Sequence, residues 1–394
     1  MATQSLDYLK EQLAELESAG SAIHPRTLEG EQLPRARFDG RDVINLASNN
    51  YLGLAAHPRL KEAASKAAAE LGAGSGAVRT IAGTMTLHRE LEQRFAAFKG
   101  ADDAIMFQSG FSANSGTVAA ILTKEDVIVS DQLNHASIID GARLSRAEIK
   151  VFPHKDADAA DRLLDESKRE GRRQLLITDG VFSMDGDIAP LPELCDVAEK
   201  HGAIMMLDDA HASGVLGKNG RGTVDHFGVH GRVDIQVGTL SKAIGVLGGF
   251  IAGPSHLIEW LVNRGRPFLF STSAPPAAAA ACIEALNILE EEPERVERLW
   301  ERTRFFKEGL RALGYDTGAS ETPITPVIAG EDRTAQHLSG LLWEDGVFTP
   351  PIVFPTVAKG SARVRTIITS EHTEDDLQQA LEAFERAGKK LGLI

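Results

Sequence analysis

Residues 203–211 read Ala-Ile-Met-Met-Leu-Asp-Asp-Ala-His, an apolar run that ends in two carboxylates and a histidine. A short continuous apolar run of this kind is typical of a strand buried on both faces of a parallel sheet. In such sheets ligands bind beyond the carboxyl ends of the strands, and Asp208 and His211 stand at such an end. Two interpretations of Asp208 are open at this point: a ligand-binding carboxylate, or the N-cap of a following helix.

Similar apolar runs recur on both sides of this stretch and alternate with helical patterns. The expected strands are 43–46, 104–107, 127–130, 174–179, 203–208, 234–238 and 248–252. The expected helices between them are 59–71, 87–98, 112–122, 157–170 and 191–201. This alternation predicts an α/β fold, in which helices cover a mainly parallel sheet.

The pattern changes after residue 285. A charge run at 290–294 is followed by helical spacing, and the expected elements beyond it are short strands at 324–328, 346–349 and 362–368 and a final helix at 375–391. These elements predict a second, smaller α+β domain.

Leucines at helical spacing over residues 5–19 predict an amphipathic N-terminal helix. It is either a surface helix or a contact with another subunit. The predicted organisation is therefore an N-terminal arm and helix at 1–45, a large α/β domain at 46–285 and a small C-terminal domain at 286–394.

The composition limits the class of protein. The 394 residues include 42 Lys and Arg against 56 Asp and Glu, which gives a net charge of −14. This acidic balance argues against a nucleic-acid-binding protein and against a polybasic membrane-surface protein. Two cysteines argue against a disulfide scaffold or a Cys-rich metal site. We therefore expect an enzyme without a metal. We also expect it in the cytoplasm, because the first residues do not resemble a signal peptide and no apolar stretch reaches the ~18 residues of a membrane span.

Lys242 lies in an apolar, Gly-rich turn just after the expected strand 234–238. Desolvation lowers the pKa of a lysine amine, as Schiff-base chemistry requires. The alternatives are a surface lysine in a loop and a lysine that binds phosphate. The glycines at 245–249 match neither G-x-G-x-x-G nor the P-loop pattern, which argues against a nicotinamide or nucleoside triphosphate site.

Two further strand exits carry candidate binding residues. Ser109, Gly110 and Phe111 follow the strand 104–107 at the start of a helix, where free backbone amides bind phosphate. His135 follows the strand 127–130, and its ring is either structural or stacks on an aromatic cofactor. An acid, a Schiff-base lysine, a phosphate-binding helix N-terminus and a flat ring are together what pyridoxal phosphate (PLP) requires.

With these motifs in place, the sequence resembles the α-oxoamine synthases, a family of fold type I PLP-dependent enzymes. The resemblance covers nearly the whole chain and rests on residues 48–53, 134–137, 179–186, 208–211, 239–242, 363–365 and 371–373. It implies PLP as the cofactor, a glycine or other small amino acid and an acyl-CoA as substrates, and a homodimer with the active site at the subunit interface.

The resemblance also implies a role for each matching residue. Lys242 would carry PLP and act as a base, Asp208 would pair with the ring nitrogen, and His135 would stack on the ring and contact substrate. The residues implied as further cofactor contacts are His211 and Ser183 at the phenolic oxygen, Ser109, Gly110, Phe111 and Thr239 at the phosphate, and Thr272 and Ser273 at the phosphate of the partner subunit. Asn49 and Arg365 would bind the amino-acid carboxylate.

Within the family, the sequence favours the glycine C-acetyltransferase branch, which forms 2-amino-3-ketobutyrate from glycine and acetyl-CoA and works in reverse in threonine catabolism. The alternative is the 8-amino-7-oxononanoate synthase branch, which joins alanine to a pimeloyl thioester with loss of carbon dioxide in biotin synthesis, or a relaxed enzyme that does both. Arg26 and Thr356 are candidate contacts for a long acyl chain, and Arg26 is equally interpreted as a surface charge.

Overall fold

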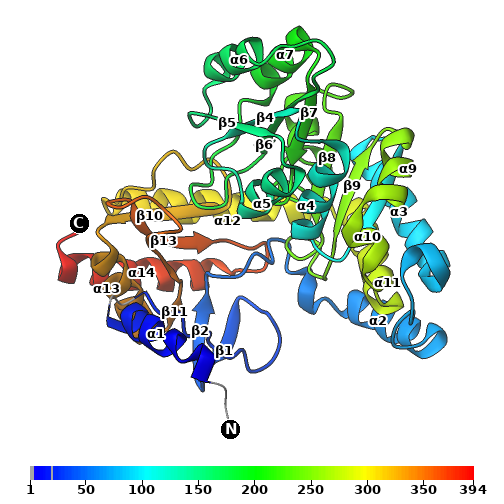
Figure 1. The fold of residues 1–394 in the computed structure, drawn as a ribbon. Coiled ribbons are helices and arrows are strands. Elements are labelled where there is room, and N and C mark those ends of the chain that lie inside the picture. Colours follow the sequence, from blue (N-terminus) through cyan, green and yellow to red (C-terminus); the bar gives the residue numbers. More distant parts are fainter. Residues whose placement is uncertain (1–3, 19–20) are drawn as a thin grey trace.

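The structure is a computed structural model that describes residues 4–18 and 21–394. A seven-stranded sheet, in the order β3-β9-β8-β7-β6-β4-β5, forms its centre (Figure 1). Its strands are β3 (Asp103–Phe107), β4 (Val127–Asp131), β5 (Glu148–Phe152), β6 (Gln174–Asp179), β7 (Ile204–Asp208), β8 (Ile235–Thr239) and β9 (Gly249–Gly253). Strands β5, β4, β6, β7 and β8 are parallel, and β9 is antiparallel to both of its neighbours. The predicted mainly parallel sheet is confirmed.

The inner strands of this sheet are mainly apolar because both faces of the sheet are covered. Every residue of β4, β6, β8 and β9 is buried. Along β6, Leu175 and Ile177 pack into one hydrophobic cluster and Leu176 into another, as expected where successive side chains point to opposite faces. Strand β5 was not expected from the sequence: it lies at the sheet edge, and its charged, partly exposed residues do not form an apolar run.

Helices pack on both faces of the sheet (Figure 1). They are α2 (Pro58–Leu71), α3 (Thr86–Lys99), α4 (Gly110–Ile121), α5 (Ala136–Ser145), α6 (Ala157–Glu166), α7 (Leu191–His201), α8 (Thr223–Phe227), α9 (Ser255–Arg264), α10 (Arg266–Phe270) and α11 (Pro276–Glu291). Short helical turns lie at η1 (Gln4–Leu6), η2 (Leu54–Ala56), η3 (Arg79–Gly83) and η4 (Lys218–Gly220). Side chains of α4 and α5 share one hydrophobic cluster with the sheet, and side chains of α6 and α7 share the cluster on the other face.

The C-terminal part builds two small sheets around a separate core. Its elements are α12 (Glu294–Ala312), β10 (Ile324–Gly330), α13 (Asp332–Glu344), β11 (Val347–Phe348), β12 (Pro351–Ile352), β13 (Ala362–Ile367) and α14 (Glu374–Leu391). One sheet has the order β10-β13-β12, and the other joins β11 to the N-terminal hairpin β1 (Arg35–Phe38) and β2 (Arg41–Asn45).

The strand expected at 43–46 was wrongly assigned to the central sheet. It corresponds to β2, which pairs with β1 and β11. The reason is packing: Ile44 and Leu46 are buried in the same hydrophobic cluster as Phe306 and Phe384 of the C-terminal helices. The proposed domain boundaries at 45 and 285 stay a prediction.

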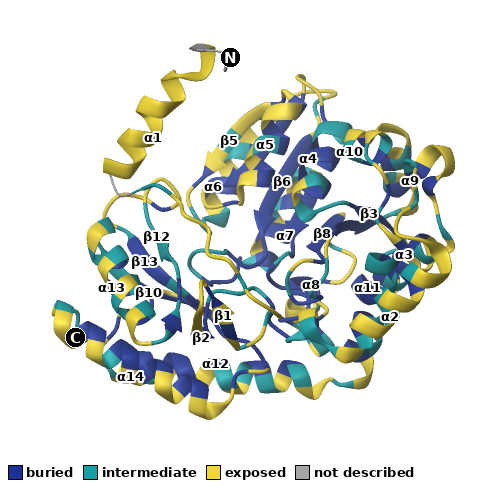
Figure 2. Ribbon diagram, turned by 90° about the horizontal axis from the view of Figure 1, so that it is seen from below, coloured by how far each residue is buried: buried dark blue, intermediate teal, exposed yellow. Residues whose placement is uncertain are grey.

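The N-terminal helix α1 (Tyr8–Ser18) buries none of its residues and stands apart from the rest of the molecule in Figure 2. Residue 19, where the helical spacing was expected to end, lies outside the described residues. Both interpretations of this helix, as a surface element or a subunit contact, therefore stay predictions. No helix within residues 4–18 and 21–394 has the length and apolar character needed to span a membrane.

A buried ion pair ties α3 to the end of β7. The Nζ of Lys99 lies 2.6 Å from Oδ2 of Asp209, and neither side chain is exposed to solvent. Lys99 also donates to the carbonyl of Arg221, and the Asp209 carboxylate accepts from the hydroxyl of Thr223. Because Asp209 directly follows Asp208, this ion pair anchors the strand end at which the candidate site lies.

We expect Lys99→Met to lower the free energy of unfolding by about 3–5 kcal/mol, since it leaves a buried carboxylate without its partner. Urea denaturation of the apo-protein measures this change. The control is Lys124→Met, because Lys124 forms an exposed ion pair with Glu125 at 3.7 Å, and exposed pairs contribute only about 0–1 kcal/mol. A loss in Lys99→Met no larger than in the control would contradict the assigned role.

Candidate active site

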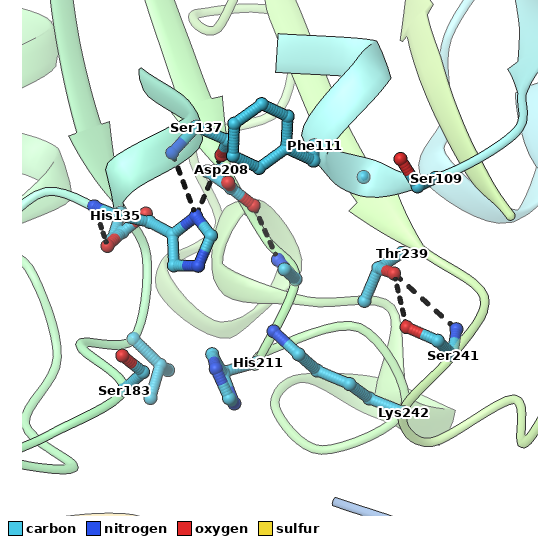
Figure 3. A pocket seen from close by; sticks show the side chains of 14 residues that line it. Ser109, Phe111, His135, Ser137, Ser183, Asp208, His211, Thr239, Ser241 and Lys242 are labelled. Carbon is cyan, nitrogen blue, oxygen red and sulfur yellow. Dashed lines mark hydrogen bonds between the residues drawn. The ribbon is translucent and has the colours of Figure 1, made fainter. Parts of the chain in front are cut away.

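The carboxyl ends of the parallel strands border a cavity of about 260 Å³ (Figure 3). Its lining residues are Ser109, Gly110, Phe111, His135, Ser137, Asp179, Val181, Ser183, Asp208, Ala210, His211, Thr239, Ser241 and Lys242. The structure therefore brings together the residues that the sequence pointed to at the exits of several strands. Ser137, Asp179 and Ser241 line the cavity as well; they lie in the matched motifs, but the sequence analysis gave them no role.

Lys242 extends into the cavity, with its amine facing the space bordered by His135, Asp208 and His211 (Figure 3). Burial lowers the pKa of Lys242 to about 8, against the attraction of the Asp208 and Asp179 carboxylates. At this pKa, roughly a tenth of the amine is neutral at pH 7. Burial thus raises the share of uncharged amine, the form that Schiff-base formation and proton abstraction require, although the protonated form still predominates at pH 7.

Asp208 is held by donors on both oxygens. Its Oδ1 accepts from the backbone amide of Ala210 at 2.9 Å, and its Oδ2 accepts from the side-chain amide of Asn114 at 2.5 Å. The carboxylate is buried at the end of β7. Its interpretation as a helix N-cap is wrong, because no helix begins after it, and the ligand-binding interpretation is left. The role of Asn114, on α4, was missed because it lies 94 residues from Asp208 in the chain, and no motif links the two.

Asp179 is a second carboxyl group beside Asp208, and the two residues are register partners on the parallel strands β6 and β7. Burial, together with the neighbouring charge of Asp208, raises the pKa of Asp179 well above its ordinary value. Its Oδ2 accepts from the backbone amide of His135 at 3.0 Å. The signal for Asp179 was present in the sequence, since it ends the apolar run 174–179.

His135 has a defined hydrogen-bonding state. Its Nδ1 accepts from the backbone amide of Ser137 at 3.2 Å and lies 2.8 Å from the Ser137 hydroxyl. Burial lowers the pKa of His135, opposed by the charge of Asp208, so the neutral ring is favoured. Because Nδ1 accepts, the neutral ring carries its hydrogen on Nε2, which is left to donate to a ligand.

His211 is also neutral. Burial, and then the positive charges of Lys242 and Arg365, hold the pKa of His211 well below its ordinary value. Its Nδ1 lies 2.7 Å from the hydroxyl of Tyr51, a fully buried residue within the 48–53 motif. Tyr51 thus fixes the orientation of the His211 ring, a role that the motif alone did not reveal.

The N-terminus of α4 fits a phosphate group. Ser109 caps this helix by accepting from the amide of Ser112 at 3.0 Å. A Cβ on Gly110 would lie 3.1 Å from the Cβ of Thr239, and a Cβ on Gly249 would lie 2.5 Å from the amide nitrogen of Gly110. Glycine therefore lets the helix amides and the Thr239 hydroxyl lie side by side, as an anion site requires.

Arg365 and Asn49 present buried polar atoms without partners. Nη1 of Arg365 donates to the carbonyl of Ser183 at 3.0 Å, but its Nε has no hydrogen-bond partner within the described part of the chain. The same is true of Oδ1 of Asn49, or of its amide nitrogen in the flipped orientation. Burial lowers the pKa of Arg365 from its ordinary value, which marks a desolvated guanidinium. Buried unpaired groups of this kind indicate a ligand, and a carboxylate matches the guanidinium.

Six residues named from the sequence do not line the cavity: Asn49, Arg365, Thr272, Ser273, Arg26 and Thr356. The Oγ of Ser273 is buried and donates within its own chain, lying 2.7 Å from the Gly83 carbonyl and 3.1 Å from the Ala77 carbonyl. Its hydroxyl is thus engaged within its own chain, and its contact with the phosphate of a partner subunit stays a prediction. Thr272 is exposed, and its contact with a partner subunit stays a prediction.

Arg26 and Thr356 also lie outside the cavity lining. The guanidinium of Arg26 stacks on Trp343 at 3.6 Å and pairs with Asp39 at 3.1 Å, so it lies against the C-terminal part. Thr356 is exposed in the loop that follows β12. Neither position shows a contact with the cavity, and their roles toward an acyl chain stay predictions.

Fold and cavity together define a fold type I PLP-dependent transferase. A family model described as aminotransferase class I and II matches residues 41–384, and the chain belongs to this family. Among solved structures it is similar to a serine palmitoyltransferase from Sphingomonas wittichii (TM-score 0.94, 33% identity, 100% of both chains). A structure of SPT with a PLP internal aldimine also matches over 100% of both chains, with a TM-score of 0.93 and 32% identity.

Comparison with curated relatives shows which branch of the PLP-dependent transferases the chain resembles. The chain is 60% identical to an 8-amino-7-oxononanoate synthase from Symbiobacterium thermophilum, over 98% of this chain and 99% of the relative. It is 54% identical to 8-amino-7-oxononanoate synthase 1 from Bacillus subtilis strain 168, over 100% of both. The chain is thus a PLP-dependent acyltransferase of the α-oxoamine synthase type.

The interpretation as a glycine C-acetyltransferase of threonine catabolism is wrong. Relatives that are 52–60% identical over nearly the full length are 8-amino-7-oxononanoate synthases. The error has a chemical reason: the resemblance assigns the same PLP residues to both branches. The motifs at 134–137, 208–211 and 239–242 therefore identify the cofactor chemistry and do not separate the acyl chains.

We expect Lys242→Ala to abolish covalent attachment of PLP, since no other lysine amine lines the cavity within the described residues. Borohydride reduction followed by mass spectrometry of peptides checks this: the wild type should gain the mass of the cofactor at residue 242. Lys218→Ala, at an exposed position, is the control and should label like the wild type. Undiminished labelling of the Lys242→Ala variant would contradict the assignment.

Proposed function

We propose that the protein joins alanine to a pimeloyl thioester with loss of carbon dioxide, the reaction of an 8-amino-7-oxononanoate synthase. The observation that carries the proposal is the 60% identity to a curated enzyme of that name over nearly the full length of both chains. The site geometry supports the same class of reaction, because Lys242 and His135 line one cavity and the guanidinium of Arg365 is bound to the carbonyl of Ser183 at its lining.

The amino-acid carboxylate binds to Arg365, with Asn49 beside it. Nη1 of Arg365 is fixed by the Ser183 carbonyl, which orients the guanidinium and leaves Nε available. A charge-assisted hydrogen bond in a desolvated site is stronger than a neutral one, so this contact supplies most of the affinity for the amino acid. It also sets the α-carbon of the substrate against the cavity residues.

When bound, PLP supplies an electron sink that stabilises negative charge at the α-carbon of the amino acid. Asp208, supported by Ala210 and Asn114, would hold the proton of the ring nitrogen. His211 and Ser183 would orient the phenolic side of the ring, and the amides at the start of α4 would hold the phosphate.

Lys242 takes the α-proton. A general base is most effective when its pKa lies near the working pH, and the desolvated amine of Lys242 has a pKa of about 8. His135 then donates from Nε2 to the oxygen of the thioester carbonyl as negative charge develops there. Its Nδ1 stays engaged by Ser137, so the donor direction is fixed.

The substrate assignment is tested by the rate of CoA release from four pairs: alanine or glycine with pimeloyl-CoA or acetyl-CoA. We expect the largest kcat/KM with alanine and pimeloyl-CoA, because the relatives carry the name of the enzyme that makes 8-amino-7-oxononanoate. A larger kcat/KM for glycine with acetyl-CoA would overturn the proposal.

We expect Arg365→Gln to raise the KM for alanine by about ten- to hundredfold, since a hydrogen bond to a charged group contributes about 1.5–3 kcal/mol. The KM for the thioester should change by less than about threefold, because the lost hydrogen bond is one to the amino-acid carboxylate and not to the thioester. Steady-state kinetics with each substrate varied in turn measure both values, and Arg304→Gln, at an exposed position on α12, is the control. An equal rise in both KM values would argue against a carboxylate-binding role.

A further inference from the structure

We propose that His154 is a positioning residue, whose imidazolium clamps together the two loops that carry His135 and Ser183. No sequence motif assigned a role to His154, and it does not line the cavity. The inference concerns the PLP site itself and holds whichever amino acid and thioester the protein uses.

The clamp consists of one ring between two carboxylates. Nδ1 of His154 lies 3.0 Å from Oδ1 of Asp131, and Nε2 lies 2.8 Å from Oδ2 of Asp187. Both carboxylates are almost completely buried, with 1% and 4% of their side chains exposed. Asp131 ends β4 and precedes His135, and Asp187 follows Ser183 in the β6–α7 loop, so the ring joins the two loops directly.

Other contacts reinforce the same junction. Asp131 accepts from the amides of Leu133 and Lys155, which fixes the start of the loop to His135. The ring of His154 packs at 89° against Phe182, with centroids 4.3 Å apart, and Phe182 is the residue before Ser183. The ring of His154 thus contacts both segments that lead to cavity residues.

Other charged groups near this junction are Lys155, Glu321 and Asp179, whose carboxyl interacts electrostatically with that of Asp131. Nζ of Lys155 lies 3.2 Å from Asp187 and 3.6 Å from Glu321, which belongs to the C-terminal part. Lys155 thus neutralises part of the charge of Asp187 but does not reach Asp131 through its side chain. With His154 uncharged, Asp187 would keep Lys155 as a charged partner, whereas Asp131 would have none among the residues that the structure describes.

The positions of these two loops matter to the chemistry because hydrogen bonds from the loops orient residues of the site, and hydrogen bonds depend on distance and direction. The backbone amide of His135 donates to Asp179, and the carbonyl of Ser183 orients Arg365. A shift of either loop moves the ring-stacking imidazole or the carboxylate grip. Misplacement by about 1 Å can cost about a hundredfold in rate.

The clamp is a charged one at neutral pH. Burial alone would lower the pKa of His154, but the hydrogen bonds and charges of Asp131 and Asp187 outweigh it and raise the pKa to about 9. Only an imidazolium has N–H donors on both nitrogens, so deprotonation releases one carboxylate. Because the folded-state pKa lies above the ordinary value of about 6.5, this stabilisation is fully present below pH ~6.5 and is lost as pH rises through about 9.

The test compares His154→Gln with His201→Gln. His201 is the matched control, since it is buried and forms a comparable bond to Asp161 at 2.6 Å between α7 and α6, outside the cavity lining. The readouts are the dissociation constant of PLP, hydrogen exchange of peptides covering 131–137 and 182–188, and the melting temperature of the apo-protein from pH 6 to 10.

For His154→Gln we expect PLP affinity to fall by about ten- to hundredfold and both peptides to exchange faster. The difference in melting temperature from the wild type should be greatest near pH 6 and disappear near pH 10. For His201→Gln we expect stability to fall with no change in PLP affinity or in exchange of these two peptides. Equal PLP affinities and exchange in the two variants, or a melting difference independent of pH, would overturn the proposal.

If His154→Gln does not fold, the wild-type apo-protein still decides the question. Histidine-labelled protein followed by NMR should show His154 titrating near pH 9, with amide resonances of residues 132–135 and 183–187 shifting at the same midpoint. A midpoint near 6.5, or loop resonances that do not follow the imidazole, would overturn it.

Discussion

Parallel strands that end at one edge of the central sheet are the constraint on which the rest of this structure depends. Strands β4, β6, β7 and β8 are hydrogen-bonded neighbours running in one direction, so the residues that follow them converge. His135, Asp179, Asp208 and Lys242 come from these exits and line one cavity. The apolar strands exclude water from below this edge, and the resulting desolvation lowers the pKa of Lys242 and raises that of Asp179.

Positive groups in and near the cavity attract anionic ligands, although the chain as a whole carries a negative net charge. The protein carries a net charge of −14, whereas the phosphate of PLP, the carboxylate of an amino acid and a thioester of CoA are all anionic. Capture therefore depends on groups placed in the cavity or beside it: the amides at the start of α4, the guanidinium of Arg365 and the amine of Lys242. Burial lowers the pKa of His135 and of His211, so both rings are neutral. His135 is then able to donate a hydrogen bond, and His211 to orient a ligand.

The sequence was informative wherever a residue lies at the end of an apolar run. Asp208, His135 and Lys242 were found in this way, and the alternation of strands and helices was sufficient for the fold class. Asp179 lies beside Asp208 because β6 and β7 are neighbours in the sheet. The periodicity of apolar residues does not predict the order of strands. For the same reason, the pairing of β2 with β11 was missed, because these strands are far apart in the chain.

Side-chain contacts between distant segments were also beyond the sequence. Tyr51 and Asn114 act on His211 and Asp208 through hydrogen bonds that only the folded chain creates. The bond between the Ser273 hydroxyl and the Gly83 carbonyl is another contact that the sequence did not reveal. The acyl preference was wrongly inferred because the matched motifs describe the chemistry at the amino-acid carbon, which the two branches share.

The most direct test of the account follows the carboxyl carbon of the amino acid. Alanine labelled with ¹³C in its carboxyl group is incubated with pimeloyl-CoA and the PLP-loaded protein, and the labelled carbon dioxide and the free CoA are quantified together. The account predicts one labelled carbon dioxide for each CoA released, and an unlabelled product with the mass of 8-amino-7-oxononanoate. CoA release with the label retained in the product, or no reaction of this pair, would contradict it.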